Sequence, residues 1–187
     1  MLITFLLIAS IITYERNTLW GHEILLWHSI SQKSPKKFRA HEWLGKAYQT
    51  AGDWENAIRH YDKAISFSRG RAIIYNNIGN VYLMKGDVAR AKSAFLIALY
   101  IDPRLGKPHS NLGNIYFSEG RFDKALEEYV IAIDNEPKSA EHHYNAGLAY
   151  SKLNTPDKAE KEYLVAIELK PDYADARKAL SELYKKK

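Results

Sequence analysis

The sequence predicts an all-α fold in which helix–turn–helix repeats stack as a solenoid and a C-terminal helix caps the last repeat. Three observations support this prediction. Tyrosine recurs at a fixed step of 34 residues, at Tyr48, Tyr82, Tyr116, Tyr150 and Tyr184. Small residues keep the same step, at Gly45, Gly79, Gly113 and Gly147 and in two alanine series from Ala57 and Ala64. A large aromatic residue also keeps it, at Tyr61, Phe95, Tyr129 and Tyr163. A fixed period of this length is typical of stacked copies of one supersecondary unit.

The spacing inside one repeat predicts a first helix, a turn and a second helix. Gly45 and Tyr48 are three residues apart, and Ala57, Tyr61 and Ala64 follow at steps of four and three, so each group lies on one side of a helix. Turn residues recur between the two groups, as Gly52-Asp53, Gly86-Asp87, Gly120-Arg121 and Asn154-Thr155. The second helix is expected to stop where proline blocks its continuation, at Pro103, Pro137 and Pro171.

The recurring small residues predict close packing of the two helices. Glycine inside a helix costs roughly 1 kcal/mol relative to alanine, so its repeated use at one position needs a packing reason. We expect this glycine to face the alanine of the second helix, and the two aromatic series to fill the space between neighbouring repeats. The predicted packing residues are Gly45, Gly79, Gly113, Gly147, Tyr48, Tyr82, Tyr116 and Tyr150.

One known repeat shows this pattern, and residues 72–105 carry it most fully. The residues that match are Tyr75, Ile78, Gly79, Tyr82, Ala91, Phe95, Ala98 and Pro103. They resemble the tetratricopeptide repeat (TPR), and the resemblance covers residues 38–187. It implies a right-handed superhelical solenoid with repeats at 38–71, 72–105, 106–139 and 140–173. The sequence departs mildly from the pattern at Arg69 and Asn154, which stand where proline and glycine are usual.

The segment 174–187 is expected to form the capping helix that covers the last repeat, as solenoids require. Its predicted apolar face consists of Leu180, Ser181 and Tyr184.

The first helices of a TPR array line its concave side, so the resemblance implies a groove that binds a protein or peptide partner. The candidate groove residues are Trp43, Asn77, Asn80, Asn111, Asn114, Phe117, Tyr144 and Asn145. An asparagine amide donates and accepts hydrogen bonds at once, which suits the backbone of an extended peptide. The alternative is that these asparagines belong to the TPR consensus and serve the fold. A clamp for chaperone tails is not expected, because Asn76 and Glu141 stand where that clamp has cations.

Composition excludes several other functions. The chain has 187 residues, a net charge of +5 and no cysteine, so thiolate chemistry and disulfides are absent. Basic residues cluster at Lys33, Lys36, Lys37 and Arg39, which fits a solvated loop, an acidic partner or anionic headgroups. No groove-reading motif accompanies this charge, so nucleic acid is not an expected partner.

No arrangement of residues points to catalysis. The seven histidines show no metal-ligand spacing, and His41, His109 and His143 share one position in their repeats, which indicates a structural role. There is no glycine-rich phosphate loop and no nucleophile–base pattern. We therefore expect no enzymatic activity, no metal and no cofactor.

Residues 1–14 carry no charge and are read as an apolar helix, either a membrane anchor or a truncated transmembrane helix. As a helix they would span about 21 Å, less than the roughly 30 Å hydrocarbon core, so an apolar solenoid helix remains an alternative. Residues 15–37 are read as a degenerate repeat or second-type helix with a linker, in which residues 20–30 stack on repeat 1. The apolar first segment also leaves self-association open.

This N-terminal region has a second resemblance. The residues that carry it are Tyr14-Glu15-Arg16-Asn17, Trp20, Leu26-Trp27, Ser34-Pro35 and Leu44-Gly45. They are similar to the junction where multi-spanning membrane glycosyltransferases, the transmembrane-and-TPR O-mannosyltransferases and their bacterial relatives, pass into a C-terminal TPR array. The resemblance implies an accessory arm on the extracytoplasmic side, with catalysis in a domain outside this sequence. The basic cluster near Lys36 favours the opposite side.

Two main hypotheses follow: a membrane-associated scaffold that binds a polypeptide, and the TPR arm of such a glycosyltransferase. A third is a subunit of a large membrane complex, held mainly through residues 1–30.

Overall fold

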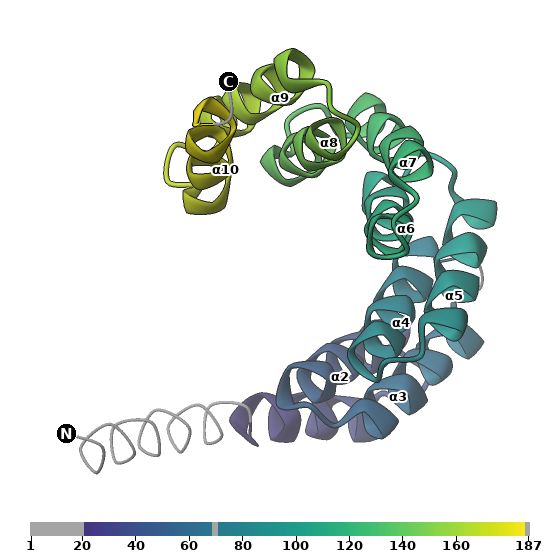
Figure 1. The fold of residues 1–187 in the computed structure, drawn as a ribbon. Coiled ribbons are helices and arrows are strands. Elements are labelled where there is room, and N and C mark those ends of the chain that lie inside the picture. Colours follow the sequence, from purple (N-terminus) through teal and green to yellow (C-terminus); the bar gives the residue numbers. More distant parts are fainter. Residues whose placement is uncertain (1–20, 69–70, 186–187) are drawn as a thin grey trace, which may run out of the picture. The chain divides into compact units, whose positions relative to one another are not determined.

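The computed structural model describes residues 21–68 and 71–185, and every regular element in them is a helix. The chain divides into two compact units, Met1–Asp87 and Val88–Lys187. The boundary falls in the turn inside the predicted second repeat. The all-α class predicted from the 34-residue register is confirmed for the described residues (Figure 1).

The first unit contains a helix at residues 21–33 followed by three further helices: α2 (Phe38–Ala51), α3 (Trp54–Phe67) and α4 (Ala72–Met84). α2 packs against α3, and both contact α4. The core of this unit is built from the residues that hold the 34-residue register and from aliphatic side chains beside them. Its fully buried members include Leu44, Ala57, Tyr61, Ala64 and Ile74.

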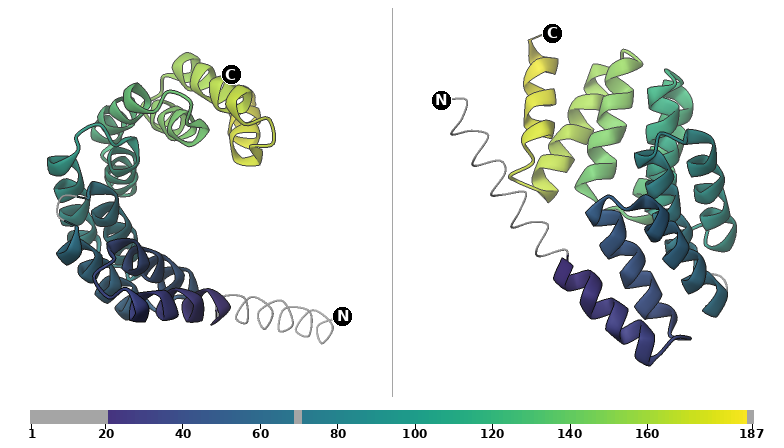
Figure 2. Two further views of the ribbon diagram at one scale, coloured as in Figure 1. Left: turned by 180° about the vertical axis from the view of Figure 1, so that it is seen from behind. Right: turned by 90° about the horizontal axis from the view of Figure 1, so that it is seen from below.

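The second unit contains α5 (Val88–Ile101), α6 (Gly106–Ser118), α7 (Phe122–Asn135), α8 (Ala140–Lys152), α9 (Pro156–Leu169) and α10 (Ala174–Tyr184). Each helix packs against the next, and α8 also contacts α6 and α10. The consecutive order of helix packing can be followed in Figures 1 and 2. Two core clusters lie between successive repeats, one around Ala125 and Tyr129 and one around Ala159 and Tyr163.

Gly45, Gly113 and Gly147 each lie against a tyrosine ring of the second helix, and not chiefly against alanine as the sequence suggested. A Cβ atom on Gly45 would lie 2.5 Å from Cδ1 of Tyr61, and one on Gly147 would lie 2.6 Å from the ring of Tyr163. The two helices are therefore in close contact at these glycines, and a tyrosine ring is the nearest neighbour, with Ala159 O also 3.3 Å from the Cβ position of Gly147. A tyrosine ring is larger than a methyl group, so it leaves no room for a Cβ atom opposite.

The recurrent tyrosines of the first helices cover these contacts from the side. Tyr116 is half-buried, with Lys92 Nζ 4.4 Å and Arg121 Cζ 4.7 Å from the centre of its ring. Tyr150 is half-buried as well, and Lys158 Nζ lies 5.6 Å from its ring centre. The two rings therefore have similar environments, an apolar cluster on one side and a cation on another.

The turn between the two helices of each repeat closes with the same pair of hydrogen bonds. Gly120 has a φ of 75°, its N–H donates to Phe117 O, and the N–H of Arg121 donates to Tyr116 O at 2.9 Å. Asn154 takes the left-handed place in the last repeat, with a φ of 56°. Asparagine tolerates this conformation better than most residues, which explains why the substitution for glycine is mild.

The apolar face predicted for the C-terminal helix was wrong at two of three residues. In α10 the buried residues are Ala176 and Leu183, whereas Ser181 and Tyr184 are exposed. Tyr48, Tyr116 and Tyr150 lie beside the second helix of their own repeat. Tyr184 instead donates its hydroxyl to Glu160 Oε1 at 2.9 Å, back on α9.

The predicted apolar helix at residues 1–14, the first part of the glycosyltransferase-like junction and the start of the segment 15–37 lie outside the described residues. Within residues 21–68 and 71–185, no helix has both the length and the apolar character needed to cross a membrane.

Candidate peptide-binding surfaces

The first unit has a pocket that contains two of the predicted groove residues. It has a volume of about 350 Å³ and is formed by the helix at residues 21–33, α2 and α4. Its lining residues are Glu23, Trp43, Lys46, Ala47, Gln49, Thr50 and Asn77. The structure thus brings Trp43 and Asn77 together, although they are 34 residues apart in sequence.

Trp43 is held in position by a second indole ring and by a cation. Its ring stacks on Trp27 with 5.4 Å between centroids and 7° between planes, and Lys46 Nζ lies 4.5 Å from its centre. Lys46 also pairs with Glu42, at 3.7 Å. Trp43 nevertheless remains 45% exposed. A large aromatic surface that is both fixed and accessible is typical of a residue that anchors a partner.

Asn77 lines the same pocket, and its amide group holds a hydrogen-bond donor that is closed off from solvent. Its Nδ2 atom is buried and has no hydrogen-bond partner within the described residues. A buried polar group without a partner costs roughly 1–3 kcal/mol, so a side-chain movement that opened this donor to a ligand carbonyl would recover that energy. Asn80 lies about one turn further along α4 and is half-buried.

In the second unit the predicted asparagines are largely engaged with one another. Asn145 is only 8% exposed, and its Nδ2 donates to Ser110 Oγ and to Asn114 Oδ1, both at 3.3 Å. Asn114 Oδ1 also accepts from the hydroxyl of Tyr129 at 2.7 Å. Asn114 itself is exposed and Asn111 is half-buried. Asn145 therefore joins α8 to α6, while Asn114 keeps a surface that a ligand could contact.

Phe117 and Tyr144 are half-buried in the second unit and pack against other rings. Phe117 meets Phe122 edge to face at 5.1 Å, and Tyr144 lies 5.1 Å from Tyr173. Burial raises the pKa of Tyr144, and the carboxylates of Asp175 and Glu182 raise it further. Its hydroxyl therefore stays protonated at neutral pH and can donate a hydrogen bond.

Sequence reasoning missed the partners of the recurrent histidines. His109 Nδ1 lies 2.7 Å from Glu128 Oε2, and its Nε2 lies 3.2 Å from the carbonyl of Pro103. His143 repeats this arrangement with Glu162 at 2.6 Å and Pro137 O at 3.1 Å. The sequence contains a signal for these pairs, because a glutamate follows the histidine by 19 residues in both repeats. In the described part of the chain, no three histidine or carboxylate side chains form a group that could hold a metal ion.

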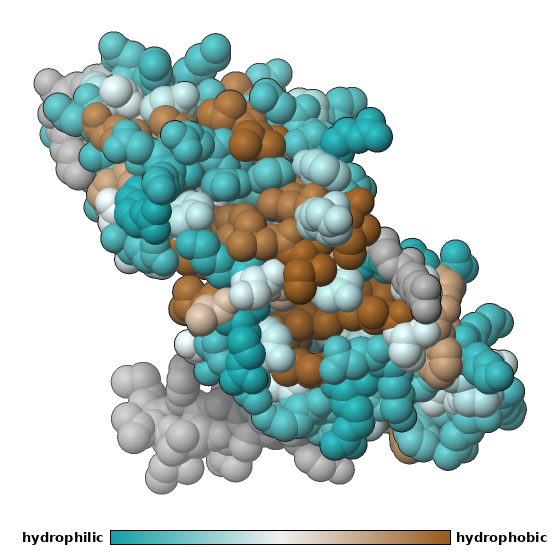
Figure 3. Space-filling view, turned by 90° about the vertical axis from the view of Figure 1, so that its right-hand side faces the viewer, coloured by the Kyte–Doolittle hydropathy of each residue, from teal (hydrophilic) through white to brown (hydrophobic). Residues whose placement is uncertain are grey.

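The second helices of the second unit expose apolar side chains that the sequence did not select as ligand contacts, among them Leu96, Tyr100 and Val130. Figure 3 shows apolar surface among polar side chains on the side where Figure 1 labels α5 and α7.

Comparison with known families identifies the repeat. The tetratricopeptide repeat model matches residues 72–105 and 140–173, and a second TPR repeat model matches residues 50–86 and 113–154. No curated protein sequence matches this chain.

Solved structures with the same fold are numerous, and three illustrate them. The thermophilic TPR protein TTC0263 of Thermus thermophilus has a TM-score of 0.72 and 19% identity, covering 92% of this chain and 94% of its own. YrrB, described as a TPR protein with an unusual peptide-binding site, has a TM-score of 0.63 and 18% identity, covering 89% and 86%. The first TPR of Spaghetti (RPAP3) bound to an HSP90 peptide has a TM-score of 0.60 and 22% identity, covering 62% and 92%.

The family matches, the glycine–tyrosine contacts and the shared turn geometry agree with one another. Repeats of this family typically act as scaffolds for protein–protein interaction. Residues 50–105 and 113–173 of this chain are therefore tetratricopeptide repeats.

Proposed function

We propose that this chain is a non-enzymatic scaffold that binds a polypeptide segment against its first helices. The observation that carries the proposal is the buried Asn77 Nδ2, which lines a pocket beside the exposed Trp43 and has no hydrogen-bond partner within the described residues. A small movement of the Asn77 side chain opens this donor to a peptide carbonyl, which supplies the missing acceptor. An apolar peptide side chain covers the indole.

The rest of the pocket suits a backbone with few demands on its sequence. Gln49 and Thr50 line the wall with groups that form hydrogen bonds, and Glu23 and Lys46 place one charge of each sign at its edge. Gln49 already accepts from the hydroxyl of Tyr61 at 2.7 Å, which fixes its amide group. Main-chain hydrogen bonds then provide affinity, while Trp43 selects an apolar side chain.

The second unit offers its own contacts through Asn114, Phe117 and Tyr144. Asn145 is assigned a positioning role there, because its amide nitrogen donates to Ser110 and Asn114. This divides the asparagines that the sequence grouped together into ligand-facing and structural members.

Peptide binding by similar folds supports the proposal in general terms. The RPAP3 structure contains an HSP90 peptide, and the YrrB structure is described by its peptide-binding site. A chaperone tail is not the expected ligand, because Asn76 and Glu141 stand at two of the cation positions of the clamp that binds such tails.

The test uses peptides selected from a random library for binding to the full chain. We expect Asn77→Ala to lower the affinity for the selected peptide by up to about tenfold, which corresponds to one net hydrogen bond. Trp43→Ala should lower this affinity at least as much. Asn135→Ala is the matched control, since Asn135 lies on a second helix and its side chain donates to Ile131 O of the same helix. Unchanged affinity in both Asn77→Ala and Trp43→Ala would refute the proposed site.

We also propose that residues 1–14 associate with a membrane, with the repeats on the extracytoplasmic side. The support is the sequence alone: an uncharged apolar segment and its resemblance to the glycosyltransferase junction. Membrane fractionation of the full chain and of a variant lacking residues 1–14 tests this proposal. Equal recovery of both in the soluble fraction would contradict it.

A further inference from the structure

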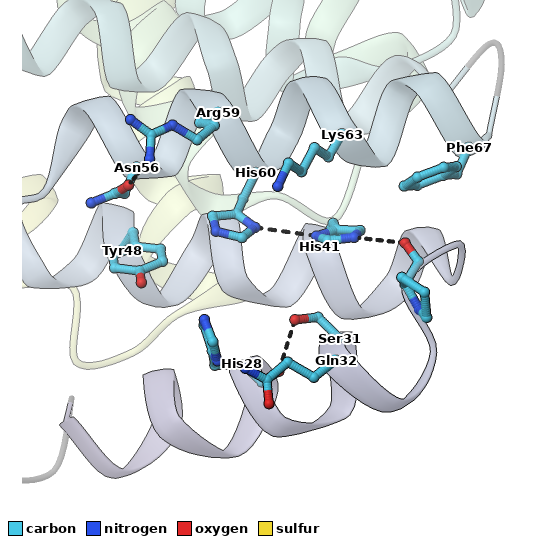
Figure 4. A pocket seen from close by; sticks show the side chains of 11 residues that line it. His28, Ser31, Gln32, His41, Tyr48, Asn56, Arg59, His60, Lys63 and Phe67 are labelled. Carbon is cyan, nitrogen blue, oxygen red and sulfur yellow. Dashed lines mark hydrogen bonds between the residues drawn. The ribbon is translucent and has the colours of Figure 1, made fainter.

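The first unit contains a second pocket, separate from the peptide site, which we call the histidine pocket. It has a volume of about 590 Å³ and lies between the helix at residues 21–33, α2 and α3 (Figure 4). The side chains that matter for its chemistry are His28, His41, Arg59, His60, Lys63 and Phe67.

Two imidazoles face one another in its wall. His41 Nδ1 lies 3.2 Å from His60 Nδ1, and His41 Nε2 lies 3.0 Å from the carbonyl of Pro35. Because a carbonyl only accepts, His41 Nε2 carries a proton, and His60 Nδ1 must donate to the remaining nitrogen of a neutral His41. The rings are held by stacking, His60 on Tyr48 at 5.3 Å and His41 on Phe67 at 5.6 Å.

Comparison between repeats of the same chain shows what this arrangement lacks. In repeats 3 and 4 the equivalent histidines, His109 and His143, face a glutamate oxygen at 2.7 and 2.6 Å. The residue at the same place in repeat 1 is His60, 19 residues after His41. The first repeat thus has the same histidine and the same proline carbonyl, but an imidazole replaces the anion.

A further cation accompanies this change. Lys63 stands where the later repeats have Ile97, Ile131 and Val165. In Figure 4 its side chain extends toward the two imidazoles. Within the described residues, no carboxylate pairs with Lys63, and Arg59 donates only to Asn56 Oδ1, at 3.0 Å.

The pocket wall therefore collects positive charge without neutralising it. Its described lining contains three histidines, an arginine and a lysine, and no aspartate or glutamate. Burial lowers the pKa of His60 to about 4, and repulsion from His41, Lys63, His28 and Arg59 in their protonated forms contributes to this effect. An anion in the pocket would reverse the electrostatic part of that effect and allow His60 to bind a proton.

We propose that the histidine pocket binds a small organic phosphate monoester. The phosphate lies between His60, Lys63 and Arg59 and supplies the anion that Glu128 and Glu162 supply in the later repeats. The organic part lies against Phe67, which is 42% exposed. A dianion fits better than a carboxylate, because a guanidinium and an ammonium stand beside the imidazoles. This ligand is separate from the peptide, so the inference goes beyond the proposed function.

The first measurement is calorimetric titration of the full chain with phenyl phosphate at pH 7.5. We expect saturable binding, with inorganic phosphate and benzoate each at least tenfold weaker. Absence of saturable binding of phenyl phosphate would overturn the proposal. Equal binding of inorganic phosphate or benzoate would overturn the assignment to an organic phosphate monoester.

The decisive variant is His60→Glu, which gives repeat 1 the His–Glu pair that repeats 3 and 4 already contain. We expect this variant to fold normally and to bind phenyl phosphate at least tenfold more weakly than the wild type. Lys63→Gln provides a second variant with the same expected loss, in case His60→Glu fails to fold. Lys161→Gln is the matched control, because Lys161 is the counterpart of Arg59 in repeat 4 and lies outside the pocket. Binding unchanged in Lys63→Gln, or lost equally in Lys161→Gln, would overturn the proposal.

An NMR titration of the histidine side chains provides an independent measurement. Saturating phenyl phosphate should raise the pKa of His60 from about 4 toward the ordinary histidine value. A His60 pKa that does not change when the ligand is bound would contradict the contact.

Discussion

Gly113 and Tyr129 are in contact so close that a single methyl group would not fit between them. A Cβ atom on Gly113 would lie 2.5 Å from Cε1 and 2.7 Å from Cδ1 of the Tyr129 ring. Tyr129 is only 2% exposed, and its hydroxyl is fixed by the hydrogen bond to Asn114, so the ring has little freedom to withdraw. The same contact between Gly45 and Tyr61 and between Gly147 and Tyr163 explains why glycine recurs at this position.

Gly113→Ala should therefore destabilise the second unit. Overpacking costs roughly 1–3 kcal/mol, against a gain of about 1 kcal/mol in helix propensity, so we expect a net loss of about 1 kcal/mol. Thermal unfolding followed by circular dichroism measures it. The control is Gly21→Ala, which has none of the described residues within 4 Å of its Cβ position and should be neutral or stabilising. A Gly113→Ala variant as stable as Gly21→Ala would contradict the packing account.

The left-handed turn residues should differ in what they tolerate. Gly120→Ala puts a side chain on a residue with φ of 75°, which costs about 1 kcal/mol. Asn154→Gly changes a residue with φ of 56° to the residue that is usual there, and we expect a shift below about 0.5 kcal/mol. Urea unfolding of the two variants compares the effects. Equal destabilisation by both would show that backbone strain is not the cause.

The His109–Glu128 pair should stabilise the protein at low pH more than at high pH. Burial lowers the pKa of His109, but the hydrogen bond to Glu128, the Pro103 carbonyl and the Glu128 charge together raise it above its ordinary value of 6.5. A raised pKa in the folded state gives stability that is fully present below pH 6.5 and is lost as pH rises through the folded pKa.

Glu128→Gln should consequently lower the melting temperature more at pH 5.5 than at pH 8.5. Both side chains are partly exposed, which weakens the interaction. The loss of unfolding free energy at pH 5.5 should therefore exceed the loss at pH 8.5 by on the order of 1 kcal/mol. Glu127→Gln changes an exposed neighbour and should have no such pH dependence. An equal loss of stability at both pH values would mean that the charge of the His109–Glu128 pair does not contribute to stability.

His60 should have the opposite effect on stability. Its pKa is lowered from 6.5 to about 4, so between these values the unfolded chain binds a proton that the folded protein excludes. Stability due to this residue therefore falls as the pH falls from 6.5 to 4. His60→Gln should lose less stability than the wild type over this range, in melting experiments without added phosphate. His22→Gln, at an exposed histidine, should follow the wild type. If the stability of His60→Gln fell with pH in parallel with that of the wild type, the lowered pKa of His60 would be contradicted.

The sequence predicted the helix pairs because their register depends on residues whose role is local. Glycine or asparagine at the turn, proline after the second helix and small residues on the facing sides all reflect backbone geometry, which spacing reveals directly. The glycine partner could not be read in the same way. Alanine and tyrosine of the second helix both lie on the inner face, and only three-dimensional packing distinguishes the ring of Tyr129 from the methyl group of Ala125 as the neighbour of Gly113.

The candidate site was predictable only in part. Trp43 and Asn77 follow from the register, but the engagement of Asn145 with Ser110 and Asn114 depends on side-chain directions between two helices. The histidine pocket shows the reverse situation. Its signal, His60 where later repeats have glutamate, is visible in the sequence once the His–Glu contact is known to exist.

The most direct test of the central proposal is an NMR measurement of intermolecular NOEs between the full chain and a library-selected peptide. The proposal predicts NOEs from the peptide to the indole protons of Trp43 and to the side-chain amide protons of Asn77. NOEs confined to the second helices, such as those to Leu96 or Val130, would contradict it.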